Sequence, residues 1–84
     1  MGPGSFEARV ELCLGRYSRA LASALAVEAR QAAPYKGEVA VAERGGCVEV
    51  MVRSSSLSGL SALLNSYLLL AHAAYSAARI ADAG

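Results

Sequence analysis

Residues 38–53 read EVAVAERGGCVEVMVR, and this stretch decides the fold of the 84-residue chain. Valines alternate with polar or small residues over Glu38 to Glu43 and again over Cys47 to Arg53, and a period of two is typical of strands with one buried face. Gly45-Gly46 separates the two runs and allows the positive φ angles of a tight reversal. The stretch therefore predicts a β-hairpin. Its inward positions are Val39, Val41, Val48, Val50 and Val52.

The residues before the hairpin predict a strand and then a helix. Apolar residues alternate with charged ones from Phe6 to Leu14, as in a half-buried strand, and Gly15 ends the pattern. Arg16 to Ala33 is rich in Ala and Leu and is expected to be helical up to Pro34, because proline disfavours the α conformation in the residue before it. Its expected buried face consists of Tyr17, Leu21, Ala24, Leu25 and Ala32.

After the hairpin, Ser54-Ser55-Ser56 is suited to capping a helix that we expect from about Leu57 to about Ala81. The chain is thus predicted to be an α+β protein of order β-α-β-β-α. Residues 1–5 are expected to be a flexible lead-in, and residues 6–84 form a single domain, since the length leaves no room for a second.

If the first helix crosses the sheet, the third strand fits between the other two in an antiparallel sheet of order 1-3-2, with both helices on one face. Two registers of the first strand against the third compete. One matches Cys13 with Cys47 and sets Glu11 opposite Glu49; the other sets Arg9 opposite Glu49. We expect the second, because like charges directly opposite each other are destabilising.

Composition narrows the function classes. Hydrophobic residues make up 55% of the chain and charged residues 18%, more apolar surface than a small monomer needs to bury. A net charge of +1 is too small to hold nucleic acid or an anionic membrane by bulk electrostatics. Two cysteines without a secretory signal pattern favour a reducing cytoplasm, where Cys13 and Cys47 serve as small apolar strand residues.

The last helix is apolar around most of its circumference, and Ser54 to Ala78 contains no Asp, Glu, Lys or Arg. A membrane span is one interpretation, but we expect no membrane role, because the helix is needed to cover the sheet. Its polar residues form one narrow stripe, and two apolar stripes occupy the rest. Such a helix should pack on its own sheet and on a partner. The polar stripe is Ser58, Ser61, Asn65, His72, Ser76 and Arg79.

Leu60 to Leu68 reads LSALLNSYL, and this run on the last helix of a short β-α-β-β-α chain resembles the CTAG/Pcc family. The core Leu64-Asn65-Ser66-Tyr67-Leu68 carries most of the resemblance, while the strands contribute only their pattern. The family supplies the small subunit of the KEOPS (EKC) tRNA-modification complex. Basic or aromatic residues are frequent in the family at positions matching Ser61, Leu69 and Leu70, and here they are absent.

The resemblance implies a non-catalytic, homodimeric scaffold subunit in the cytoplasm that binds the ATP-dependent catalytic subunit through its helices. That partner installs threonylcarbamoyl on a tRNA adenosine, so tRNA is reached indirectly. From the second apolar stripe we expect the first helix and the long helix to offer a groove for two partner helices. Asn65 either fixes their register by an amide hydrogen bond or is simply exposed on the polar stripe. The partner-binding residues we expect are Leu63, Asn65, Tyr67, Leu70, Ala73 and Ala77.

The sequence gives little support for a metal site, for catalysis or for RNA binding. His72 is the only histidine, and Cys13 and Cys47 lack metal-ligand spacing, so we expect no zinc site, no cofactor and no enzymatic activity. The alternative function is a small K-homology-like RNA-binding module, in which Arg16, Arg19 and Arg30 of the first helix would contact RNA. The Gly-x-x-Gly clamp and the stacking aromatic residues of such modules do not occur in this sequence.

Overall fold

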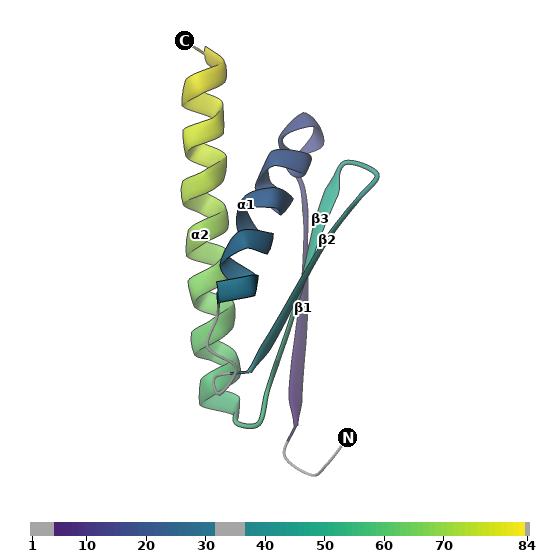
Figure 1. Cartoon of the computed structure of the whole chain (residues 1–84), viewed down its shortest axis with the longest axis vertical. Helices are drawn as coiled ribbons and strands as arrows, with labels where there is room; N and C mark the ends of the chain where they lie inside the picture. Colours follow the sequence, from purple (N-terminus) through teal and green to yellow (C-terminus); the bar gives the residue numbers. More distant parts are fainter. Residues whose placement is uncertain (1–4, 32–36, 84) are drawn as a thin grey trace.

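The computed structural model describes residues 5–31 and 37–83. In chain order the elements are strand β1 (Phe6–Cys13), the short 3-10 helix η1 (Gly15–Tyr17), helix α1 (Ser18–Gln31), strands β2 (Glu38–Arg44) and β3 (Cys47–Ser54), and helix α2 (Leu57–Ala83). The strands form one antiparallel sheet in the order β1-β3-β2, which confirms the predicted fold class. Both helices lie on the same face of the sheet, and α2 continues beyond its end (Figure 1).

The first helix begins two residues later than its sequence predicts. Gly15 has a φ of 58°, which a right-handed helix does not allow, and the chain passes through η1 before α1 starts at Ser18. The buried Ser18 hydroxyl accepts a hydrogen bond from the Leu14 N–H and donates one of 2.6 Å to the Gly46 carbonyl. This serine therefore joins β1, α1 and the hairpin. The predicted helix end near Ala33, and residues 1–4 of the predicted lead-in, lie outside the described residues.

The core lies between the inner face of β3 and the two helices. Inward and outward positions alternate along all of β3, as predicted, and Val48 and Val52 have no exposed surface. Of the predicted buried face of the first helix, Leu21 and Leu25 are buried, Tyr17 is half-buried, and Ala32 lies outside the described residues. The prediction was wrong at Ala24, which is exposed, because α1 turns only a narrow stripe toward the sheet. The buried apolar residues of the described chain are Leu21, Leu25, Val48, Val50, Val52, Leu60, Leu63, Tyr67 and Ala71.

The hairpin turn is confirmed, since Gly45 and Gly46 have φ angles of 58° and 80°. The expected register was wrong: Cys13 lies opposite Cys47, and Glu11 lies opposite Glu49. A shift of two residues keeps every apolar side chain on the same face, so burial of the core does not distinguish the two registers. Hydrogen bonds at the end of β1 favour the observed one: the Gly15 N–H donates to the Gly46 carbonyl at 3.1 Å, and the Ser18 hydroxyl donates to the same carbonyl. Repulsion between the Glu11 and Glu49 carboxylates is weak, because Glu11 is exposed and Glu49 is only half-buried, so water screens both charges. Arg9 also lies 3.9 Å from Glu49.

Gly37, immediately before β2, has a φ of 136°, and an added Cβ would lie 2.2 Å from the Arg53 carbonyl oxygen. We expect Gly37→Ala to lower the free energy of unfolding by about 3 kcal/mol or more, because strained backbone and overpacking both contribute. Gly45→Ala is the matched control, since it has a φ of 58° with nothing within 4 Å of the added Cβ, and it should cost about 1–2 kcal/mol. Urea unfolding measures both, and equal losses would contradict the close approach at Gly37.

Candidate interaction surface

Helix α2 has an inner side that packs on the sheet and an outer side that the described chain leaves uncovered. The inner side buries Leu60, Leu63, Tyr67 and Ala71. At about 100° per residue, the exposed apolar residues of the outer side fall within one arc of about 100°. We call this arc the outer surface of α2; it consists of Ala62, Leu69, Leu70, Ala73, Ala77 and Ile80, all of them exposed.

The six expected partner-binding residues divide between the two sides. Leu70, Ala73 and Ala77 lie on the outer surface of α2, and Asn65 is exposed near its margin. Leu63 and Tyr67 instead belong to the core, where they are 8% and 5% exposed. The reason is that α1 packs beside α2 and extends the buried region around the helix as far as Leu63.

The part of α2 that extends beyond the sheet is held by side chains from η1. Tyr17 donates a 3.0 Å hydrogen bond to Asp82, and its ring meets that of Tyr75 edge to face with centroids 5.4 Å apart. Arg16 forms an ion pair with Asp82. These contacts fix the direction of the last turns, so the outer surface of α2 is presented on a straight, anchored helix. They also use Arg16, one of the three residues expected to contact RNA.

The other two arginines of the RNA hypothesis, Arg19 and Arg30, are exposed on α1 and have no ion-pair partner among the described residues. Because Arg16 is paired with an acid, the expected basic stripe is reduced to two charges at opposite ends of the helix. Such a pair offers few contacts to a nucleic-acid backbone.

The outer face of the sheet, which the helices do not cover, carries a network of ion pairs. Glu7 accepts hydrogen bonds from Arg9 at 3.1 Å and from Arg53 at 3.2 Å, and these bonds lower the pKa of Glu7. Arg53 also lies 3.8 Å from Glu38. Small or apolar residues lie among the charges, including Ala40 and Met51. This face is therefore suited to water or to a polar interface.

We expected Cys13 and Cys47 to be separate, small apolar strand residues, and this expectation was wrong. Cys13 and Cys47 form a disulfide between β1 and β3, closing a loop over a sequence separation of 34. The register explains the bond, because it places the two residues directly opposite each other. Such a bond stabilises the sheet by restricting the unfolded chain. Glu11 lies beside it on the same outer face.

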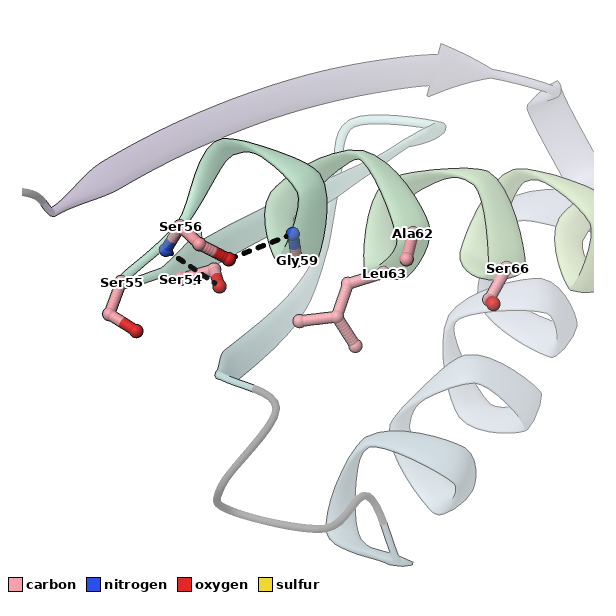
Figure 2. Close-up of a pocket in the computed structure, with 7 residues that line it drawn as sticks. All are labelled: Ser54, Ser55, Ser56, Gly59, Ala62, Leu63 and Ser66. Carbon is pink, nitrogen blue, oxygen red and sulfur yellow. Dashed lines mark hydrogen bonds between the residues drawn. The ribbon is translucent and has the colours of Figure 1, made fainter.

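A hollow of about 330 Å³ lies where the serine turn enters α2 (Figure 2). Ser56 caps the helix, since its hydroxyl accepts the Gly59 N–H at 3.0 Å, and the Ser54 hydroxyl accepts the Ser56 N–H at 3.4 Å. No charged side chain is among the described residues that line it. Ser54 and Ser56 are thus explained by capping, and the described residues that line the hollow supply no acid, base or cation for catalysis or phosphate binding.

By length and composition alone, α2 would also be able to cross a membrane, although one such helix is weak support for a span. Only 22% of its most apolar window is buried. The four core residues on its inner side argue for a helix attached to the sheet, because withdrawing them would expose the valines of β3 to water.

No protein-family model matches the chain, and no curated protein matches it significantly.

The burial of Tyr67 in the core can be tested by the pH dependence of stability. Burial, with a smaller contribution from Glu28, raises the pKa of its phenol above the ordinary value near 10. Its neutral form therefore contributes stability that is present below the unfolded pKa and is lost as pH rises through the folded one. When the pH is raised from about 8 to 10.5, we expect the free energy of unfolding of Tyr67→Phe to fall by less than that of the wild type. Urea unfolding at each pH measures both. Tyr75→Phe is the control on the same helix, and identical losses in Tyr67→Phe and wild type would place Tyr67 outside the core.

Proposed function

We propose that this protein is a non-catalytic scaffold subunit of the KEOPS type, which dimerises and binds the ATP-dependent threonylcarbamoyl-transferase subunit through its helices. The observation that carries the proposal is the outer surface of α2, an apolar strip that the described chain leaves in solvent. The position of the Leu64-Asn65-Ser66-Tyr67-Leu68 motif on this helix supports it.

The dimensions of α2 favour a helical partner. Its 27 residues span about 40 Å, whereas an eight-residue strand spans about 26 Å. Ala73 and Ala77 let a second helix approach closely, and Leu69 and Leu70 supply side chains that would insert between its residues. Two partner helices laid along α1 and α2 would complete a four-helix bundle and cover the strip.

The scaffold role assigns different tasks to the two sides of α2. Leu63 and Tyr67 hold the helix on the sheet, and Leu70 with its neighbours meets the partner. In this proposal the catalytic groups belong to the partner, and the small subunit contributes position and stability. Binding to tRNA is then indirect, through the assembled complex.

Leu70→Asp tests the partner surface. Burying a leucine is worth about 1.5–3 kcal/mol, and the mutation also places a charge in the interface, so binding to the catalytic subunit should weaken at least about a hundredfold. Leu68→Asp is a closely matched control: Leu68 is 40% exposed and Leu70 37%, but Leu68 faces Leu12 and Tyr75, about 160° away around the helix. Isothermal titration calorimetry with the purified catalytic subunit measures both.

Equal weakening by Leu68→Asp and Leu70→Asp would contradict the assignment of the outer surface. Unchanged affinity in Leu70→Asp would place the partner elsewhere. A pull-down from the source cell separates the scaffold role from the RNA-binding role: recovery of a large ATP-binding protein supports the former, and RNase-sensitive RNA without that protein supports the latter.

The proposed dimer has its own test. Light scattering at micromolar concentration should give twice the 8.6 kDa mass of one chain. Leu70→Asp should keep that mass, because the proposal reserves the outer surface of α2 for the catalytic subunit and leaves the sheet for the second copy. A monomer in the wild type would contradict dimerisation, and a monomer only in Leu70→Asp would show that α2 serves self-association.

A further inference from the structure

Three side chains with metal-ligand chemistry meet at one end of the outer sheet face. The ligand atoms of Glu11, Cys13 and Cys47 all lie within 4.8 Å of one another. The two cysteines come from opposite strands, so the missing C-x-x-C spacing, from which we expected no zinc site, does not exclude one. A small hollow of about 70 Å³ adjoins them, lined by Glu11, Cys47 and Glu49 among others.

In the structure the two sulfur atoms are bonded to each other, which leaves no thiolate to bind a metal. A thiol reductant, either one dithiol of the thioredoxin class or two molecules of glutathione, changes this. The disulfide accepts two electrons and two protons, two Cys thiols form, and the reductant leaves as its own disulfide. Two thiols are then held opposite each other by the register of β1 and β3, beside a carboxylate.

We propose that reduction of the Cys13–Cys47 disulfide creates a site for a thiophilic divalent cation of the Zn²⁺ class, with Cys13, Cys47 and Glu11 as ligands. Two thiolates and a carboxylate are ligands that Zn²⁺ accepts in tetrahedral sites, and binding releases the thiol protons. The fourth position opens to water, because Glu11 and Cys13 are exposed. The disulfide and the metal are alternative clamps between the same two strands.

The charged groups around the cluster are two carboxylates and two arginines, to which reduction adds two thiols that can ionise. Glu49 lies opposite Glu11, so two carboxylates and, after reduction, two thiols occupy adjacent cross-strand positions on one face. Arg9, which is 3.9 Å from Glu49, and Arg44, which lines the same hollow, balance these two carboxylates, so the net negative charge that favours a cation comes from the two thiolates formed on binding. A bound divalent ion would also offset the weak repulsion between Glu11 and Glu49.

Cobalt(II) is the probe for the test, because thiolate ligands give it a charge-transfer absorption that oxygen ligands do not. We expect the chain, reduced with a phosphine in the absence of oxygen, to bind one Co²⁺ per chain with that absorption, and Zn²⁺ to displace it. The oxidised chain should show no such absorption, and neither should Cys47→Ser. Glu11→Gln should weaken binding by about tenfold or more while both thiols remain.

Glu7→Gln is the control, since Glu7 lies on the same strand and face but outside the cluster, and its affinity should equal that of the wild type. Equal affinity in Glu11→Gln and wild type would overturn the proposal, as would one metal shared between two chains. Circular dichroism of the reduced protein belongs to the test, because loss of the sheet on reduction would remove the register on which the site depends and overturn it too.

Discussion

The inner face of β3 is the surface on which the rest of the structure depends. Its three valines are buried because β1 and β2 flank the strand and both helices lie over it. A three-stranded sheet has two faces, and two helices are enough to cover only one of them. The polar outer face with its ion pairs follows from this limit.

The inner face of β3 accounts for only one of the two apolar sides of α2. One side is required by the valines of β3, and Leu60, Leu63, Tyr67 and Ala71 meet that requirement. The outer surface of α2 has no such purpose within the described chain, yet it is rich in leucine and alanine. In a chain of 84 residues with few charges, an exposed helix face of this kind lowers solubility, and a protein partner that buries the face would remove this effect.

Much of the fold could be predicted from the sequence, because a period of two and the Gly45-Gly46 turn are local signals. The register could not, since the bonds from Gly15 and Ser18 to Gly46 join residues 31 and 28 positions apart, and a rule about facing charges ignores them. The disulfide was missed for the same reason. The helical wheel placed Leu63 on one face with Leu70, Ala73 and Ala77, but it could not show that α1 draws Leu63 into the core.

The ion pairs on the outer face also limit how two copies could meet. Stacking two outer faces would remove Arg9, Arg53 and their glutamates from water, and desolvation of such charges often exceeds the gain from pairing them. Pairing through the open edge of β1 or β2 would instead satisfy backbone N–H and C=O groups and leave the charges in solvent. We infer that a dimer, if formed through the sheet, joins edges, and this geometry keeps the Glu11, Cys13 and Cys47 side chains on a face open to a reductant and to metal.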